Sequence, residues 1–378
     1  MKDVTDIARA YAQSVKDEQL ALLKELGSVP SPTRHEDERA VFCRDWLMSK
    51  GARDVYIDDA KNTICRINYT DDRELIVFAA HTDIVFPDTE PLEVIEENGR
   101  LYAPGIGDDT GNLVNLLLCA RYLLENGTGT EYGVLIVANS CEEGLGNLDG
   151  TKALFEKYGS RVKYYYSFDG YMPDCCCGAV GSHRYKVTCT TEGGHSLVDF
   201  GKPNAIEHLC RLVEELYSIE VPQEAKTTYN VGRFEGGTTV NTIAQSASML
   251  YEFRSGSQDC LKIMERAFEA AVEKCSEADA PLSVELLGIR PGSGPIDADV
   301  MERFTSLSDS IIKKFCGEVR HEALSTDSNI PLSVGIPANT IGTVCGAGMH
   351  TREEWIDIAS LQTGLALALT LVLQYAEC

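Results

Sequence analysis

The sequence lacks the features that mark repeat proteins and nucleic-acid-binding proteins. No low-complexity tract and no obvious short repeat occurs in its 378 residues, which argues against a solenoid. It also lacks an excess of positive charge, because 34 Lys and Arg residues against 58 Asp and Glu residues give a net charge of −24. Such a surface repels phosphate backbones and anionic headgroups. We therefore expect neither a nucleic-acid partner nor a membrane partner.

Long uninterrupted apolar runs are missing as well. Residues 1–26 alternate charged and apolar residues at helical spacing, without the apolar core of a signal peptide. The apolar run at 364–373 is too short to span a bilayer and predicts a buried helix. With 44% hydrophobic residues the chain can bury a large core, and its length suggests about two domains. We expect a cytoplasmic protein.

Cysteine is abundant, but a paired CxxC motif is absent. In a long chain without an export signal, we expect the 14 cysteines to be reduced and to serve as small hydrophobic residues. The run Cys175–Cys177 raises the possibility of a structural zinc site. Adjacent side chains of an extended segment point in opposite directions, which argues against that site. The role of this run stays open.

Strand-like and helix-like segments alternate in the first half of the chain. Buried strands are expected at 73–80, 132–140 and 162–170, and a helix is expected at 112–125. Strands that alternate with helices form a mainly parallel sheet with helices on both faces. We therefore expect an α/β domain, whose ligands would collect beyond the carboxyl ends of its strands.

The pattern changes near Gly181. Three segments between 183 and 255 alternate like half-exposed strands, and helical segments are expected at 204–218 and 260–275. This is typical of a smaller α+β domain with an antiparallel sheet. The chain thus divides into a first part of the α/β domain, an inserted α+β domain and a second part of the α/β domain, at 1–180, 181–293 and 294–378.

Polar residues that can bind metals follow the expected strands of the larger domain. They are His81, Asp83, Asp108, Asp109, Glu142, Glu143, Asp169 and His350. Taken singly, each could be a helix-capping acid, a surface residue or a core histidine. Taken together, they would reach one edge of the sheet, where acids without a counterion repel one another strongly. One or two divalent metal ions resolve this conflict.

The number of ligands favours two metals over one. Histidine and carboxylate ligands suit Zn²⁺, and Mn²⁺ or Co²⁺ are possible. A single catalytic zinc needs three protein ligands and a water, whereas this set allows two ions that share one bridging carboxylate. Two metals roughly 3.5–4 Å apart can hold a hydroxide and polarise a carbonyl group. One acid must then stay uncoordinated to transfer protons.

The ordered motifs resemble those of a known family. In chain order they are HTD, GIGDDTGN, CEEG, FDG and GMHTREE. This set resembles the M20 family of co-catalytic zinc metallopeptidases, which includes tripeptidases, carboxypeptidases, aminoacylases and deacylases of amino-acid biosynthesis. The resemblance covers nearly the whole chain. It implies a mainly parallel-sheet catalytic domain with an inserted lid or dimerisation domain.

The resemblance implies a role for each metal ligand. His81 and Asp169 would bind one metal ion, and Glu143 and His350 would bind the other. Asp108 would bridge the two ions, with the peptide bond between Asp108 and the next residue in the cis form, as in the family.

Two further acids would support the reaction. Asp83 would orient His81 through the second ring nitrogen of the imidazole. Glu142 would be the general base, which takes a proton from the water between the metals and passes it to the leaving amine.

The inserted domain also matches the family. The resemblance implies that His195 stabilises the oxyanion and is donated by the partner subunit in dimeric members, so we expect a homodimer through this domain. Asn241 and Arg254 would hold the substrate carboxylate, for which the forked guanidinium is well suited. The alternatives are that Arg254 is a surface strand residue and that His195 is part of a glycine turn.

Other positions are less informative. The segment 325–337 resembles the stretch that shapes the substrate pocket, with Asp327 and Asn329 as candidates. The chain departs from many members by Thr110 in place of Lys and by Glu252 in place of Asp, which concerns substrate details more than catalysis.

The remaining histidines form no recognisable cluster in the sequence. His35 is expected at an exposed helix start, and His183, His208 and His321 are expected to be structural.

Three functions follow from these observations. The first is a dizinc exopeptidase that cleaves a di- or tripeptide, with a lean towards the tripeptidase branch. The second keeps the mechanism but removes the acyl group of an N-acyl amino acid. The third is a non-catalytic binding protein of the same fold. It predicts the loss of Glu142 or of a metal ligand, and none of these is missing.

Overall fold

The structure of the protein is a computed structural model that describes residues 3–376. The chain forms two compact units. The larger unit combines the part of the chain up to Gly178 with the part from Pro295 onward. The inserted unit is Ala179–Gly294. Each unit has its own hydrophobic core.

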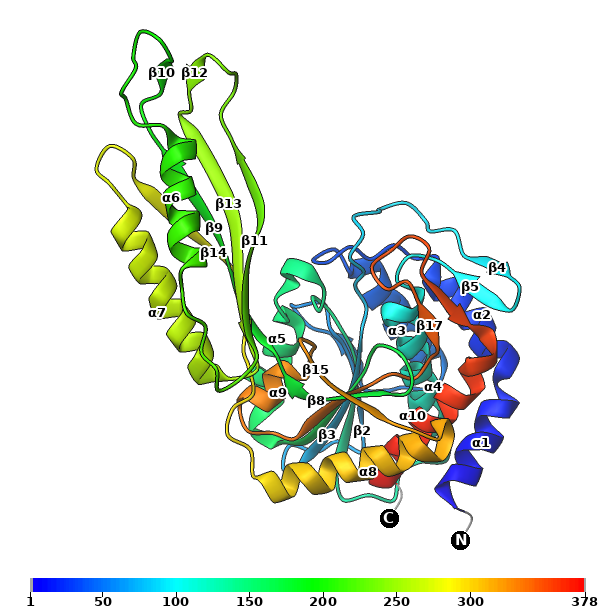
Figure 1. The fold of residues 1–378 in the computed structure, drawn as a ribbon. Coiled ribbons are helices and arrows are strands. Elements are labelled where there is room, and N and C mark those ends of the chain that lie inside the picture. The colour runs from blue at the N-terminus through cyan, green and yellow to red at the C-terminus, as the bar shows by residue number, and fades with distance from the viewer. Residues whose placement is uncertain (1–2, 377–378) are drawn as a thin grey trace. The chain divides into compact units, whose positions relative to one another are not determined.

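An eight-stranded sheet forms the centre of the larger unit (Figure 1). In spatial order its strands are β1 (Val55–Ile57), β2 (Thr63–Ile67), β6 (Gly133–Asn139), β3 (Leu75–His81), β7 (Val162–Phe168), β16 (Ala338–Ile341), β8 (Asp174–Ala179) and β15 (Arg320–Leu324). The central strands from β6 to β16 are parallel to one another. Every residue of β3 and β6 is buried, as strands covered on both faces require.

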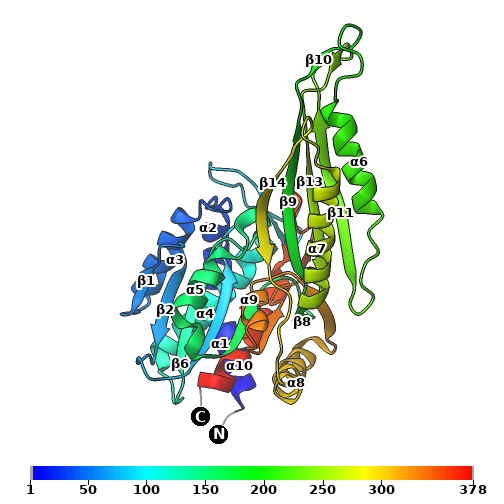
Figure 2. The same ribbon diagram turned by 90° about the vertical axis from the view of Figure 1, so that its left-hand side faces the viewer.

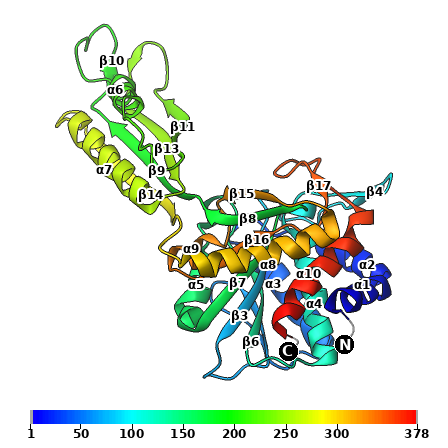
Figure 3. The ribbon, with the colours of Figure 1, turned by 60° about the horizontal axis from the view of Figure 1, so that its bottom comes forward.

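Helices cover both faces of this sheet. They are α1 (Val4–Ser14), α2 (Lys16–Gly27), α3 (Asp37–Ser49), α4 (Asn112–Asn126), α5 (Asp149–Tyr158), α8 (Ala298–Cys316), α9 (Asn329–Ser333) and α10 (Leu361–Ala376). Successive residues of a strand point to opposite faces. Accordingly, Tyr165 of β7 contacts Phe155 of α5, whereas Tyr166 contacts Phe304 of α8 and Tyr375 of α10. Figure 3 shows α8 and α10 crossing one face. The predicted α/β class is confirmed.

The last helix is a core element. Among the described residues, Ile358–Ala376 is the one stretch that is long and apolar enough to cross a membrane by length and composition, with a mean hydropathy of 1.4. However, 61% of this stretch is buried inside the protein. Its side chains pack in the same core as those of α1 and α4. This agrees with the buried helix predicted from the apolar run.

A small antiparallel sheet carries two loops of the larger unit. Its strands are β17 (Gly346–Ala347), β18 (Trp355–Asp357), β5 (Arg100–Tyr102) and β4 (Ile95–Glu97). The guanidinium of Arg100 lies 3.6 Å from the ring centre of Trp355, which joins β5 to β18. The loop 348–354 connects β17 to β18, and the loop after β5 leads into the tight turn Ile106–Gly111.

The inserted unit is a four-stranded antiparallel sheet with two helices (Figure 2). Its strands are β9 (Gly181–Thr190), β11 (Thr227–Gly236), β13 (Ser246–Ser255) and β14 (Leu282–Arg290), its helices are α6 (Ala205–Tyr217) and α7 (Gln258–Cys275), and a short pair is formed by β10 (Gly194–His195) and β12 (Thr242–Ile243). Side chains of α6 and α7 pack on β9 and β13 in one core. Burial alternates along β13, as a sheet with one covered face requires.

Candidate metal centre

Three parallel strands of the larger unit end side by side at the candidate site. His81 is the last residue of β3 and pairs with Asn139, the last residue of β6. Glu142 and Glu143 follow β6 after a short turn, and Asp169 directly follows β7. The carboxyl ends of the strands therefore bring together the polar residues expected there.

The two histidines of the site converge on one carboxylate. His81 Nε2 lies 3.0 Å from Oδ1 of Asp108, and His350 Nε2 lies 3.1 Å from Oδ2 of the same residue. His350 Nε2 also lies 3.1 Å from Oε1 of Glu143. Asp169 offers an oxygen within 4.8 Å of ligand atoms of His81 and Asp108. Two groups of ligands thus share Asp108.

Asp83 organises the loop that carries the two glutamates. Its Oδ1 accepts a hydrogen bond from the backbone N–H of Glu142 at 3.0 Å, and its Oδ2 accepts one from Glu143 at 2.9 Å. The Nδ1 atom of His81 lies 3.0 Å from the backbone carbonyl oxygen of Asp83 and 3.5 Å from its carboxylate. Contact with His81 is therefore closest through the main chain of Asp83, while its side chain fixes the glutamate loop.

A further acid, Glu354, fixes the loop of the shared carboxylate. It accepts hydrogen bonds from the backbone N–H groups of Gly105, Gly107 and Asp108 at 2.9, 2.9 and 2.8 Å. The peptide bond between Asp108 and Asp109 is cis, as the resemblance implies. Glu354 is almost fully buried. Glu354 lies within the GMHTREE motif, but the sequence does not distinguish it from its neighbour Glu353.

The crowding of acids changes their proton affinities. Burial and the charge of Asp108 raise the pKa of Asp169 to about 7, and the same two causes raise the pKa of Glu354 to about 7. Hydrogen bonds to Asp108 and Glu143 raise the pKa of His350 to about 10. Burial opposes ionisation of Asp108, but its hydrogen bonds to the two histidines lower its pKa below the usual value. Asp169 and Glu354 therefore hold a proton more tightly than isolated carboxyl groups do, whereas Asp108 holds one less tightly.

The residues present fit a pair of divalent metal ions. Each oxygen of Asp108 faces a different histidine, which is the arrangement that a bridging carboxylate needs. His81 and Asp169 would complete one ion's ligands, and Glu143 and His350 would complete the other's. Imidazole and carboxylate donors suit Zn²⁺, Mn²⁺ and Co²⁺.

A buried arginine lies behind the site. Arg39 is fully buried and donates hydrogen bonds to the carbonyl oxygen of Thr82 at 3.1 Å and to Oγ1 of Thr110 at 3.0 Å. Burial lowers its pKa to about 10, and the charges of Asp83 and Asp109 oppose that shift. Thr110, noted above as a departure from the family, thus contacts a cation supplied by α3. No periodicity in the sequence distinguishes this arginine from a solvent-exposed one.

The predicted residues of the inserted unit fall into two places. His195 lies on β10 opposite Thr242 of β12, and the carbonyl oxygen of Asn241 accepts a hydrogen bond from Ser196 N at 3.1 Å. His195 and Asn241 are therefore neighbours. Arg254 lies near the far end of β13, where Nε and Nη2 donate to the carboxylate of Glu252 at 3.0 and 3.1 Å.

Asp327 and Asn329 are fully buried in the larger unit. Asp327 accepts a hydrogen bond from Thr151 Oγ1 at 2.5 Å and another from Nδ2 of Asn139 at the end of β6. Asn329 Oδ1 accepts a hydrogen bond from the N–H of Thr326 at 3.0 Å. Both side chains support the strand ends from inside the protein, and their expected role in the substrate pocket stays a prediction.

One of the remaining histidines lies in a cluster that the sequence does not show. His321 Nε2 lies 2.8 Å from Oδ1 of Asp309, and ligand atoms of both residues lie within 4.8 Å of the sulfur of Cys175. Cys175 lies on β8, far in the sequence from Asp309 on α8 and His321 on β15, which are consecutive elements. Only the pairing of β15 beside β8 brings them together. His35 is exposed just before α3, as expected.

Comparison with known proteins identifies a family and several relatives. The model of the family described as peptidase family M20/M25/M40 matches residues 77–374. Protein YqjE of Bacillus subtilis is 25% identical over 372 residues, which cover 93% of this chain and 97% of the relative. A succinyl-diaminopimelate desuccinylase of Bordetella petrii is 23% identical over 282 residues, which cover 68% of this chain and 72% of the relative.

A solved structure extends the comparison to the fold. The crystal structure of aminopeptidase PepT from Bacillus cereus matches with a TM-score of 0.72 and 22% identity. The match covers 94% of this chain and 97% of that chain. At this identity, the likeness shows that the two proteins share a fold.

Proposed function

The chain belongs to peptidase family M20/M25/M40 and is a metal-binding hydrolase of that family, and on this premise we propose that it is a dimetal exopeptidase that cleaves a di- or tripeptide. The observation that carries the proposal is the placement of Asp108, whose two oxygens face His81 and His350. Glu142 lies beside this pair of ligand groups and within reach of His81 and Glu143.

The protein's own residues would supply the proton transfers. Two bound zinc ions would contribute Lewis acidity, which lowers the pKa of a water and polarises a carbonyl group. Glu142 takes the proton from the attacking water and delivers it to the nitrogen of the leaving amine. Asp83 accepts a hydrogen bond from the backbone N–H of Glu142 and so fixes the main chain from which this base extends. His195 donates a hydrogen bond to the developing oxyanion.

Replacing Glu142 with Gln tests the role of this base. The amide keeps the size of the side chain but cannot take a proton, so we expect turnover to fall by about 10²–10⁴-fold or more. Metal content, measured on the same preparations, should remain that of the unchanged protein. Glu131→Gln, an exposed glutamate before β6, is the matched control and should keep full turnover. Unchanged turnover in Glu142→Gln with metals bound contradicts the assigned role.

The second candidate is a deacylase of N-acyl amino acids. It is supported by the similarity to the desuccinylase of Bordetella petrii. Both reactions hydrolyse an amide, so the metal ligands do not distinguish them. An activity assay on free tripeptides, dipeptides and N-acetyl amino acids separates the peptidase from the deacylase. The protein is first stripped of metal with a chelator and then reloaded with Zn²⁺, Mn²⁺ or Co²⁺. Preference for substrates with a free amine supports the peptidase, and preference for acylated amino acids supports the deacylase.

We also propose that the protein acts as a homodimer through the inserted unit. His195 lies on the short β10–β12 pair, which precedes the start of β13, and Arg254 lies near the other end of β13. At ~3.3 Å per residue, this ten-residue strand separates them by roughly 30 Å. Two such side chains of one chain cannot both touch a di- or tripeptide. A single site that uses both therefore takes them from different subunits.

Exposed apolar side chains beside His195 also support a dimer. Leu197, Val198, Phe200 and Val240 are almost fully exposed in the described structure. Apolar groups gathered in this way are typical of interaction surfaces. Replacing Phe200 with Ser should shift the mass measured by sedimentation towards the monomer and reduce turnover. A monomeric parent protein with full turnover would contradict the proposal.

The cytoplasm is the compartment we propose for this protein. The cysteines within residues 3–376 are free, and most of them are buried. Free thiols persist in a reducing compartment.

A further inference from the structure

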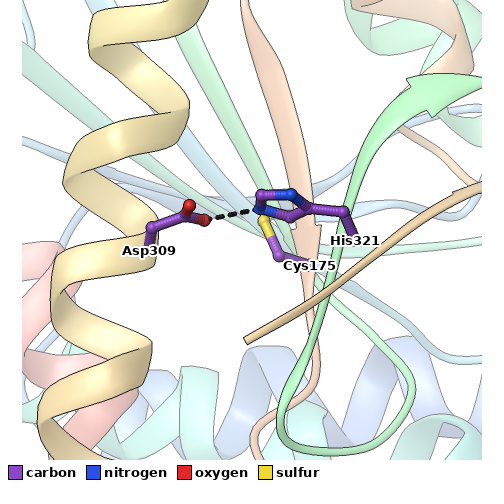
Figure 4. Close-up of side chains that lie close together, drawn as sticks. All are labelled: Cys175, Asp309 and His321. Carbon is purple, nitrogen blue, oxygen red and sulfur yellow. Dashed lines mark hydrogen bonds and ion pairs between the residues drawn. The ribbon is translucent and has the colours of Figure 1, made fainter. Parts of the chain in front are cut away.

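A second cluster of metal-ligating side chains lies in the larger unit and shares no residue with the candidate metal centre. It consists of Cys175 on β8, Asp309 on α8 and His321 on β15 (Figure 4). One sulfur, one oxygen and one nitrogen of these residues lie within 4.8 Å of one another. In Figure 4 the three side chains point toward one another from three separate elements.

We propose that Cys175, Asp309 and His321 bind a third metal ion, a zinc ion or a similar thiophilic divalent cation. The donor set contains a sulfur, unlike the imidazole and carboxylate donors at the strand ends. Sulfur and imidazole ligands select Zn²⁺ over Mg²⁺ or Ca²⁺. This third site is independent of the proposed hydrolysis, because none of its residues takes part in that reaction.

The distances suit one tetrahedral ion. Zinc binds sulfur at ~2.3 Å and nitrogen or oxygen at about 2.0–2.2 Å, so ligand atoms around it lie roughly 3.3–3.7 Å apart. His321 Nε2 and Asp309 Oδ1 lie 2.8 Å apart and must separate by roughly half an ångström. Side-chain rotation is sufficient for this shift, because His321 is half-exposed and Asp309 is partly exposed.

The charges of the site balance when the cation is bound. A thiolate and a carboxylate carry two negative charges, a neutral imidazole carries none, and the divalent ion carries two positive charges. A neutral assembly avoids the cost of burying a net charge, which matters because Cys175 is fully buried. The half-exposed His321 leaves the ion a path from solvent.

Cys177 or a water would occupy the fourth position. Residues two apart on a strand share a face, so Cys177 projects to the same side of β8 as Cys175. Cys176 points to the other side, where its sulfur accepts a hydrogen bond from Leu324 N at 3.2 Å. The alternation of side chains along the strand therefore excludes only Cys176, the middle cysteine of the run, as a ligand of this ion.

Cys175, Asp309 and His321 could instead form a catalytic site with Cys175 as the nucleophile. The burial of the Cys175 thiol argues against this role. A nucleophile must reach its substrate, whereas Cys175 has no exposed surface. A bound ion has a structural use here instead. All five residues of the edge strand β15 are exposed, and a metal ligand on His321 would tie that strand to β8 and α8.

Cobalt loading of the full chain tests the third site. A cobalt–thiolate bond gives a charge-transfer absorption band in the near ultraviolet, while imidazole and carboxylate ligands give none. The chelated, reduced protein is loaded with Co²⁺, and its spectrum and its metal content per chain are measured. We expect the thiolate band, and one ion more per chain than in His321→Ala.

Matched variants decide the outcome. Cys175→Ser and His321→Ala should each lose the band and one ion per chain, whereas Cys176→Ser and His35→Ala should keep both. His321 and His35 are both accessible from solvent, so neither alanine variant disturbs a core. The proposal is overturned if the parent protein shows no thiolate band, or if His321→Ala keeps the band and the full metal content. The proposal would also be overturned if Cys176→Ser and His35→Ala lost the band and one ion per chain.

Discussion

At the scale of single residues, an acid outside the expected metal ligands supports the loop of the shared carboxylate. Glu354 accepts three backbone hydrogen bonds from the loop that holds Asp108, and it does so from the loop that carries His350. The carboxylate of Glu354 therefore links the loop of Asp108, the shared ligand, to the loop of His350, the ligand that comes last in the sequence. Such supporting groups change metal affinity by ~10–100-fold when they are lost.

Replacing Glu354 with Gln should weaken metal binding by about 10–100-fold. The amide has a single oxygen for the three N–H donors, and its NH₂ group faces at least one of them, so the loop around Asp108 loosens. Competition with a chromophoric chelator measures the zinc dissociation constant. Glu353→Gln, the exposed neighbour, is the control and should bind zinc as the parent does. Equal dissociation constants for the two variants would refute the positioning role.

The same residues show how far the sequence could predict the site. His81, Asp108 and Glu143 could be predicted because each follows a buried strand or lies in a motif whose neighbours demand a counterion. Glu354 could not, because Glu353 and Glu354 are the same residue type at adjacent positions and only the folded loop decides which is buried. Arg39 could not be predicted for the same reason, because the sequence of a helix does not distinguish a buried arginine from an exposed one.

At the scale of elements, α10 is held by a close approach to a loop after β16. A Cβ atom added to Gly364 would lie 1.5 Å from the carbonyl oxygen of Thr343, a backbone atom that cannot rotate away. Asn115 of α4 donates to that same carbonyl oxygen at 3.0 Å. The helix, the loop and α4 therefore meet at a point where only glycine fits.

Gly364→Ala should destabilise the larger unit by about 2 kcal/mol or more. Alanine favours a helix interior by about 1 kcal/mol over glycine, but overpacking against backbone costs about 1–3 kcal/mol or more, and here the overlap is severe. Both tryptophans, Trp46 and Trp355, lie in the larger unit, so urea unfolding followed by fluorescence reports on it.

Gly178→Ala is the control for this change, because its added Cβ atom would meet Ala323 at an ordinary 3.6 Å. We expect its unfolding midpoint to stay within a few tenths molar urea of the parent, on the order of 1 kcal/mol or less. An unfolding midpoint for Gly364→Ala equal to that of the control would show that the loop can move aside.

Elements with strong periodicity were predictable, and elements without it were not. The apolar run 364–373 indicated a buried helix, and α10 is one. The strand β15, with the sequence RHEAL, has neither alternation nor an apolar run, so nothing in it indicated a strand. Its pairing at the sheet edge brings His321 to Cys175, which explains why the second cluster could not be found from spacing alone.

At the scale of the whole molecule, two separate cores divide the chain. The core of the larger unit draws on both of its stretches, and the core of the inserted unit lies wholly within Ala179–Gly294. The ends of the inserted unit are adjacent, because Ala179 N donates a hydrogen bond to Ser293 Oγ at 3.0 Å. A short linker can therefore replace it without stretching the chain.

Replacing residues 179–294 with a short Gly-Ser linker should leave a folded larger unit that still binds metals. Its core and metal ligands are all retained, so we expect cooperative unfolding by tryptophan fluorescence and the metal content of the full chain. Turnover should be lost, because His195 and the proposed dimer surface are removed. A shortened chain that fails to fold would show that the larger unit depends on the inserted one for stability.

The position of β16 has a consequence for biosynthesis. This strand lies between β7 and β8, yet it is made only after the whole inserted unit. At ~5–20 residues per second, the ribosome needs on the order of ten seconds to synthesise 179–341, during which the edge of β7 that pairs with β16 lacks this partner. An unpaired edge of this kind invites pairing with other chains. Chaperone demand and aggregation of this protein should therefore peak while the nascent chain ends within the inserted unit.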